Sequence, residues 1–215
     1  MVLIMYSQNN EDEIIFDYFK VMYPENEGIR TMIDIGANDG KTFSNSLLFV
    51  ENGWKCTLIE PSKRAFTLLK DLHSNNPNVI LHNYGFAMFN GTQTFYESGA
   101  YRDGDDVALY SSLNEEEIEK WKNDVPFIEV EAEFITWFDF RSENHEKFDF
   151  ISIDCEGFDL TLLNQMDLNK LGCKCLCIEW NSIESVKQNI LDYCKTFGFS
   201  ELHRNPENLI LIKNK

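Results

Sequence analysis

The chain has 215 residues, of which 43% are hydrophobic and 26% are charged, a balance typical of a globular domain with a sizeable core. Its net charge of −17 disfavours binding to nucleic acid or to an anionic membrane surface, because both partners are recognised through basic side chains. No apolar run is long enough to span a bilayer, and the apolar start at residues 1–5 lacks the basic residues of a signal peptide. We therefore expect one cytoplasmic domain over residues 1–215, with its six cysteines reduced.

The first elements along the chain are a helix and a short strand. Residues 10–23 carry apolar side chains at helical spacing, which predicts a helix within an N-terminal helical segment of residues 1–30. Residues 31–35 are typical of a buried strand, residues 36–40 (Gly-Ala-Asn-Asp-Gly) break it, and residues 41–51 predict a helix. A strand that ends in glycines and leads into a helix lets a ligand approach the backbone.

The residue types in this glycine loop discriminate between nucleotide ligands. The dinucleotide fingerprint needs a glycine where the chain has Asn38, and the acidic Asp39 follows directly. The Walker phosphate loop is also incomplete, because Ile35 stands where its first glycine is needed. Asp34 and Asp39 favour a cationic ligand, and S-adenosylmethionine carries both a sulfonium and an ammonium group. A tight turn that binds no ligand is the alternative.

The middle of the chain alternates strands and helices and then becomes irregular. Strands are predicted at residues 55–59 and 79–83, with a helix at 62–73 between them. Asn90-Gly91 is a hairpin signal, which predicts pairing of residues 87–89 with 94–96. The next predicted elements are a loop at 97–106, a capped helix at 114–121 and an alternating strand at 127–134.

The last third predicts further strands and helices in alternation, at 148–153, 158–171, 174–180 and 182–197, and then a hairpin of 200–204 and 208–213. Alternation of this kind indicates a mainly parallel sheet with helices on both faces, to which the hairpin adds an antiparallel strand. Ligands bind such sheets beyond the carboxyl ends of the strands. That rule predicts a site built from residues 34–40, 60, 83–87, 154–157 and 179–181.

Three cysteines, Cys173, Cys175 and Cys177, alternate along one of the predicted strands. Alternation would place all three on one face, and their spacing is too short for the Cys-x₂-Cys loops of zinc sites. We expect these thiols to pack in the core rather than to bind a metal.

Together these segments resemble the FkbM family of S-adenosylmethionine-dependent methyltransferases. The matching residues are 34–40, Ser44-Asn45-Ser46, Gly53-Trp54, Ile59-Glu60-Pro61, Ala87, Gly91, Phe95 and 153–157, with Ser7-Gln8 and Glu11-Asp12 near the start. The resemblance covers nearly the whole chain in the family's order. It implies a Rossmann-like class I methyltransferase fold, a three-layer sandwich around a mostly parallel seven-stranded sheet with an antiparallel C-terminal hairpin strand. It also implies methyl transfer to oxygen, often that of a sugar hydroxyl.

The resemblance implies a binding site for S-adenosylmethionine after the first strands. Asp34 and the small loop residues would hold the methionine end, whose carboxylate would reach backbone N–H groups. Glu60 ends the second strand, where a carboxylate can accept both ribose hydroxyls. The expected cofactor-binding residues are Asp34, Gly36, Ala37, Asn38, Gly40, Glu60, Pro61 and Ala87, the last beside the adenine.

Asp154 and Glu156 are the expected catalytic residues. Two neighbouring carboxylates at a strand end raise the pKa of one of them, which suits a general base. The same pair could instead hold a divalent cation, and the sequence leaves this choice open. The alternative is structural, with Asp154 capping the following helix and Glu156 in its first turn. Glu179, at the end of the next strand, is a third candidate carboxylate.

Residues 97–126 are expected to form an insertion that covers the acceptor site. Its acidic and aromatic side chains fit a neutral polyol, with a sugar ring stacking on Tyr101, Tyr110 or Trp121, and Ser111 and Ser112 nearby. The predicted activity is O-methylation of a small-molecule or glycan acceptor, such as a sugar or a related polyol natural product. The alternatives are a non-catalytic binding module, a methyltransferase for a non-sugar acceptor, and a nicotinamide enzyme, which Asn38 disfavours. The sequence leaves the oligomeric state open.

Overall fold

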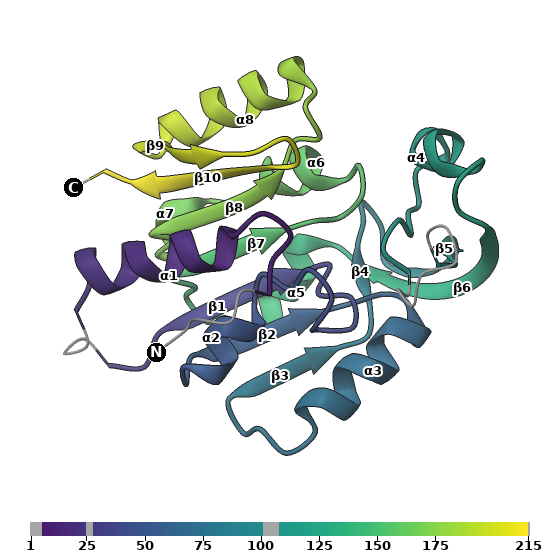
Figure 1. Cartoon of the computed structure of the whole chain (residues 1–215), viewed down its shortest axis with the longest axis horizontal. Coiled ribbons are helices and arrows are strands. Elements are labelled where there is room, and N and C mark those ends of the chain that lie inside the picture. Colours follow the sequence, from purple (N-terminus) through teal and green to yellow (C-terminus); the bar gives the residue numbers. More distant parts are fainter. Residues whose placement is uncertain (1–5, 25–27, 101–107, 215) are drawn as a thin grey trace.

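A seven-stranded sheet runs through the centre of the computed structural model, which describes residues 6–24, 28–100 and 108–214. The strand order is β3-β2-β1-β7-β8-β10-β9, and β10 runs antiparallel to both of its neighbours while the other pairs are parallel (Figure 1). This topology confirms the expected class I methyltransferase fold. The strands are β1 (Thr31–Ile35), β2 (Lys55–Ile59), β3 (Val79–His82), β7 (Phe150–Ile153), β8 (Cys175–Glu179), β9 (Phe199–Arg204) and β10 (Asn208–Lys213).

Helices cover both faces of this sheet. On one face, α1, α2 and α3 share a core with Met32 and Phe150, whereas α5, α6, α7 and α8 share the opposite core with Ile33 and Ile151. Alternate residues of each strand therefore enter different cores, as the pleat requires. No helix in the described part of the chain combines the length and the apolar character needed to cross a bilayer. The helices of the two layers are α1 (Glu11–Met22), α2 (Leu47–Glu51) and α3 (Lys63–His73), and α5 (Trp137–Glu143), α6 (Asp159–Leu163), α7 (Leu168–Leu171) and α8 (Glu184–Thr196).

A smaller sheet projects from one side of the main sheet (Figure 1). Its order is β4-β6-β5, where β5 (Gly91–Ser98) pairs antiparallel with β6 (Phe127–Ile135), and β4 (Gly85–Phe86) runs parallel to β6. Helix α4 (Glu115–Trp121) lies between β5 and β6 in the sequence. We call the described part of residues 91–135 the lobe. Phe95, Ala132 and Phe134 of the lobe form a small core of their own with Ala87.

The predicted hairpin around Asn90 is wrong, because β5 pairs along its length with β6. The side chain of Asn90 instead contacts the start of α5. Its Oδ1 accepts a hydrogen bond from the N–H of Thr136 (2.8 Å), and its Nδ2 donates to Asp139 Oδ2 (2.6 Å). Helix α5 was not predicted, although Thr136 does cap it by accepting a bond from the N–H of Asp139 (3.1 Å).

The helix predicted over residues 41–51 begins only at Leu47. The Asp39 carboxylate accepts hydrogen bonds from the N–H groups of Lys41 (2.8 Å) and Thr42 (2.7 Å) and holds the backbone in a turn. Such local bonds from a side chain to the backbone compete with helix formation.

Two further predictions need correction. Residues 158–171 form the two short helices α6 and α7 rather than one, and Asp167 caps α7 through a bond from the N–H of Lys170 (3.0 Å). Cys175 and Cys177 share the core beside α1, but Cys173 lies in the opposite core because it precedes β8. All six cysteines are free thiols. The apolar start at residues 1–5 and Tyr101 lie outside the described residues.

Candidate active site

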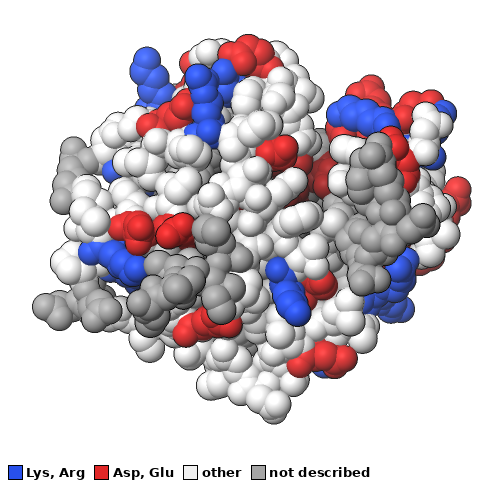
Figure 2. Space-filling view, in the orientation of Figure 1, with Lys and Arg blue, Asp and Glu red and all other residues white. Residues whose placement is uncertain are grey.

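A cavity of about 560 Å³ opens beyond the carboxyl ends of the strands and is lined by residues of both the main sheet and the lobe. Strand β2 lies on one side of β1 and β7 lies on the other. The loops after β1 and β7 therefore meet at the point where the strand order switches direction. On the face shown in Figure 2, acidic side chains lie beside the boundary between the sheet and the lobe.

The loops after β1 and β7 touch at Gly36. Gly36 has a φ of 89°, and a Cβ at this position would lie 1.7 Å from the carbonyl oxygen of Asp154. The N–H groups of Gly36 and Ala37 both donate to the carbonyl oxygen of Ile59, each at 3.0 Å. Only glycine fits here, because the loop is wedged between the backbone ends of β2 and β7.

The N–H groups of residues 36–38 are therefore engaged within the protein. Asn38 donates its N–H to Glu60 Oε2 at 2.9 Å, in addition to the two bonds that Ile59 accepts. This differs from the expectation that a cofactor carboxylate reaches these groups, and the reason is that the end of β2 already accepts from all three.

Two hydrogen-bond acceptors in the cavity wall beside this loop lack a donor among the described residues. The Oδ1 atoms of Asn38 and Asn45 are buried at the cavity and have no hydrogen-bond partner among the described residues. The Asp34 carboxylate is 3% exposed, and burial raises its pKa against the lowering effect of the Ser46 and Ser152 side chains. A wall of unpaired amide oxygens and a buried carboxylate needs hydrogen-bond donors, and a ligand ammonium group would supply them.

Glu60 presents a fixed carboxylate at the end of β2. Its Oε1 accepts from the N–H of Ser62 (2.7 Å) and its Oε2 from that of Asn38 (2.9 Å). Burial raises the pKa of Glu60 to about 7, against the lowering effect of these two bonds. Each oxygen keeps a lone pair for a donor in the cavity, as a ribose diol would provide.

Asp154, Glu156 and Glu179 form a carboxylate cluster, with one oxygen from each within 4.8 Å of the others. Burial, followed by the negative charges of Asp159 and Asp34, raises the pKa of Asp154 to about 8. Burial and the neighbouring carboxylates also raise the pKa of Glu156 and of Glu179 well above the usual value. Carboxylates this close can share a proton or coordinate one divalent cation.

Asp159 shapes the loop that carries this cluster and was missed by sequence reasoning. Its carboxylate, 5% exposed, accepts hydrogen bonds from the N–H groups of Cys155 (2.7 Å) and Gly157 (3.1 Å). Burial raises the pKa of Asp159 to about 6. Because α6 begins at Asp159, the structural alternative for Asp154 and Glu156, a helix cap and a first-turn residue, is wrong. The available signal was an acidic side chain two residues after a loop glycine.

Strained backbone is concentrated around the cavity. Within the described ranges, seven residues other than glycine have a positive φ, and five of them line the cavity. Strain of this kind persists where the surrounding structure enforces it, and it is frequent at active sites. The five residues are Asn38, Phe43, Ala108, Glu156 and Asn181.

Segments from opposite ends of the chain build another wall. Glu11 is fully buried, and its Oε1 accepts from the Nδ2 atoms of Asn205 (2.7 Å) and Asn208 (2.9 Å). The carbonyl oxygen of Glu207 in turn accepts the N–H of Trp180, directly after β8, at 2.7 Å. Hydrogen bonds thus connect the start of α1 to the β9–β10 turn, and that turn to the end of β8.

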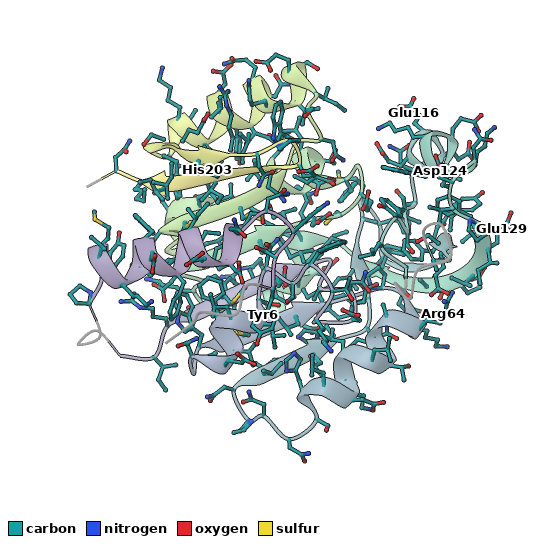
Figure 3. All side chains as sticks on the ribbon, in the orientation of Figure 1. Tyr6, Arg64, Glu116, Asp124, Glu129 and His203 are labelled. Carbon is teal, nitrogen blue, oxygen red and sulfur yellow. The ribbon has the colours of Figure 1, made fainter. Side chains whose placement is uncertain are left out.

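The lobe supplies the remaining wall. The rings of Tyr110 and Trp121 pack together with centroids 4.3 Å apart and an interplanar angle of 34°, and both line the cavity. Ser112 Oγ donates to the carbonyl oxygen of Glu156 at 2.6 Å, which joins the lobe to the loop after β7. At the base of the lobe (Figure 3), Arg64 Nη1 lies 3.3 Å from Glu97 Oε2.

Most of the predicted site residues come together at this cavity. Gly40 does not line it, because Gly40 packs on α3, where a Cβ would lie 2.5 Å from Leu69 Cδ1. His82, at the end of β3, has its ring 5.0 Å from that of Tyr84 and lies outside the cavity. The predicted residues that line it are Asp34, Gly36, Ala37, Asn38, Glu60, Pro61, Ala87, Asp154, Glu156 and Glu179.

Residues 34–201 match the model of the FkbM methyltransferase domain. The chain belongs to this family. No curated protein matches it. An FkbM methyltransferase is expected to have the class I fold, and the solved structures similar to this chain agree with that fold.

Three of these structures are a SAM-dependent methyltransferase from Agrobacterium tumefaciens, a methyltransferase from Geobacter sulfurreducens and monomeric WbdD. The first has a TM-score of 0.51 and 11% identity, over 96% of this chain and 63% of that one. The second has a TM-score of 0.50 and 10% identity, over 98% and 81%. The third has a TM-score of 0.50 and 10% identity, over 97% and 42%. The chain thus spans less than two thirds of the Agrobacterium protein and of WbdD.

Proposed function

We propose that this FkbM-family protein transfers the methyl group of S-adenosylmethionine to a hydroxyl oxygen of a sugar, a glycan or a related polyol. The observation that carries the proposal is that the glycine loop after β1, Glu60 and the carboxylate cluster all line one cavity. Family and fold support the methyl donor, whereas the acceptor and the oxygen atom are inferred from the chemistry of the cavity.

The residues present fit the methyl donor. Asp34 and the unpaired amide oxygens of Asn38 and Asn45 would accept hydrogen bonds from its ammonium group. Glu60 would accept from the ribose hydroxyls, while Ala87 and its neighbours would border the adenine. Gly36 allows this close approach, since any side chain there would collide with Asp154.

When bound, S-adenosylmethionine supplies an electrophilic methyl group that leaves sulfur as a neutral thioether while the acceptor oxygen bonds to it. Asp154 would accept the proton of the acceptor hydroxyl, because a base with a pKa of about 8 is matched to work near neutral pH. Burial and the negative charges of Asp159 and Asp34 would sustain that pKa. A positioned base contributes roughly 10²–10⁴-fold to such a reaction.

A divalent cation is the second arrangement that the cluster supports. Three carboxylate oxygens within 4.8 Å of one another are suitable ligands for Mg²⁺ or Ca²⁺. A cation there would orient an acceptor diol and lower the pKa of its hydroxyl, in place of proton transfer to Asp154.

The test is incubation of the purified protein with S-adenosylmethionine and a panel of neutral sugars, with methylated products measured by mass spectrometry. Asp154→Asn should lower the rate by about 100-fold or more. Glu129→Gln, on the outer side of the lobe (Figure 3), is the matched control and should not. Methylation of only amines or only nucleic acid would contradict the proposal.

A further inference from the structure

The charged side chains that line the cavity, among the described residues, are all acidic. Among the described residues that line it, seven are acidic and none is Lys, Arg or His. Two described basic side chains of α4 and α3 are paired with acidic ones, Lys120 Nζ with Glu117 Oε1 at 2.6 Å and Arg64 Nη1 with Glu97 Oε2 at 3.3 Å. The seven acidic residues are Glu11, Asp34, Glu60, Asp154, Glu156, Glu179 and Glu207.

Such a wall suits a cationic methyl donor but offers a phosphate no cationic partner among the described lining residues. Binding of a phosphorylated ligand normally depends on Arg, Lys or a set of free backbone N–H groups. Those of Gly36, Ala37 and Asn38 are already bonded to the end of β2. An acceptor that carries a phosphate or a nucleotide diphosphate would therefore lose its hydration at this wall without a cationic side chain or a free loop N–H group to replace it among the described residues.

The acceptor side of the cavity offers an apolar surface instead. The paired rings of Tyr110 and Trp121 are presented by the lobe, which is fixed in place near the carboxylate cluster. Ser112 forms a bridge with Tyr96 in β5, with N···O distances of 3.1 Å in both directions, and bonds to the carbonyl oxygen of Glu156. The start of α4 also contacts Gly157, where a Cβ would lie 2.9 Å from Glu117 Cγ.

We propose that this site selects an unphosphorylated sugar, whose ring packs its C–H face on the Tyr110–Trp121 pair, and excludes sugar phosphates and nucleotide-linked sugars. This inference rests on the proposed methyl transfer to a sugar hydroxyl and specifies the form in which the sugar is bound. The aromatic pair supplies the contact area, and the lack of Lys, Arg and His among the described lining residues supplies the discrimination.

The experiment is a competition between forms of one sugar. A neutral methyl glycoside, the corresponding sugar 1-phosphate and the nucleoside diphosphate sugar are offered together with S-adenosylmethionine, and each methylated product is quantified by mass spectrometry. For whichever sugar in the panel is methylated, we expect kcat/KM for the neutral form to exceed those of the charged forms by about tenfold or more.

Two variants test the aromatic pair. Trp121→Ala should raise KM for the neutral sugar roughly tenfold, and Trp121→Phe should restore most of the loss because a ring remains. Phe138→Ala removes an aromatic side chain that is 77% exposed and lies outside the cavity, so it should leave KM unchanged. Binding of S-adenosylhomocysteine, followed by thermal shift, checks that the variants keep the donor site.

The outcomes separate the two levels of inference. Equal or preferred methylation of the phosphorylated forms would overturn the charge selection and leave sugar methylation standing. An unchanged KM in folded Trp121→Ala would overturn the role of the aromatic pair. Methylation of no sugar in any form, with S-adenosylhomocysteine still bound, would overturn the proposed function itself.

Discussion

The carbonyl oxygen of Asp154 occupies the space that a side chain at residue 36 would need, since a Cβ there would lie 1.7 Å away. This contact joins the loop that would hold the methyl donor to the loop that carries the carboxylate cluster. The spacing between the glycine loop and the carboxylate cluster is thus set by backbone packing rather than by flexible side chains. From the sequence pattern, the only role expected for Gly36 is in cofactor binding. The structure gives it a second role, which is to let the loops after β1 and β7 touch.

Gly36→Ala should abolish binding of S-adenosylhomocysteine and lower the melting temperature, because the loops after β1 and β7 must separate to make room for the alanine side chain. Gly53→Ala is the matched control, since Gly53 also has a positive φ of 79° but a Cβ there would have no neighbour within 4 Å. That variant should cost only about 1–2 kcal/mol of backbone strain. Calorimetry measures the binding of S-adenosylhomocysteine, and thermal denaturation measures the melting temperature of each variant. Equal losses in the two variants would mean that the contact with Asp154 does not matter.

Glu60→Gln should weaken binding of S-adenosylmethionine by about tenfold or more, because the amide nitrogen cannot accept the hydrogen bond that one carboxylate oxygen accepts now. Isothermal titration calorimetry gives the affinity, with Glu131→Gln at an exposed position of β6 as control. Unchanged affinity would remove Glu60 from the proposed ribose contact.

Ionisation of Asp154 should make the protein less stable and more active as the pH rises. Its pKa of about 8 in the folded state exceeds the ordinary value of 3.8, so its contribution to stability is complete below pH 3.8 and is lost as the pH rises through about 8. The methyl-transfer rate should rise over the same upper range, since the base must be ionised.

Asp154→Asn should therefore raise the melting temperature at pH 9, by roughly 2–4 °C for each kcal/mol regained, while it removes activity. Thermal scans at pH 6 and pH 9 on the wild type, Asp154→Asn and the Glu129→Gln control give the comparison. A variant less stable than the wild type at pH 9 would show that the carboxylate of Asp154 is already compensated.

Chelation distinguishes the two arrangements of the carboxylate cluster. If Asp154 is the base, treatment with EDTA followed by desalting should leave the rate of methyl transfer unchanged. A rate that is lost on chelation and restored by Mg²⁺ would assign the cluster to a cation instead.

Glu11→Ala should destabilise the wall formed by the two ends of the chain. Asn205 and Asn208 would both lose the acceptor of their side-chain amides, at a cost of about 1–3 kcal/mol for the buried Asn208 and less for the half-buried Asn205. The melting temperature should fall and KM for S-adenosylmethionine should rise. Asp17→Ala, which removes an exposed acidic side chain of the same helix, should change neither.

The main sheet was predictable because most of its strands are local apolar runs bounded by turn residues, although β9 is mostly polar and exposed. The placement of Gly36 and Glu60 at the ends of strands follows from the alternation of strands and helices. The family motif predicts the same placement. The lobe was not predictable in this way, since Gly91 pairs with Phe134 across a long stretch of sequence. Asn90 gave a local hairpin signal that its contacts with α5 override.

The candidate site was only partly predictable for a related reason. Asp154 and Glu156 stand close together in the sequence, so their proximity could be read from it. Asp159 acts through two bonds to the loop backbone, and Glu11 through asparagines nearly two hundred residues away. Such partners are set by tertiary packing, which no local pattern of residues records.

The tie between Glu11 and the β9–β10 turn has a consequence for synthesis of the protein. Translation supplies Glu11 early, but its partners Asn205 and Asn208 emerge from the ribosome almost two hundred residues later. A nascent or prematurely terminated chain that lacks this turn has a buried-type carboxylate without these partners and an open cavity wall. Completion of the β9–β10 hairpin is therefore needed to close this wall of the cavity.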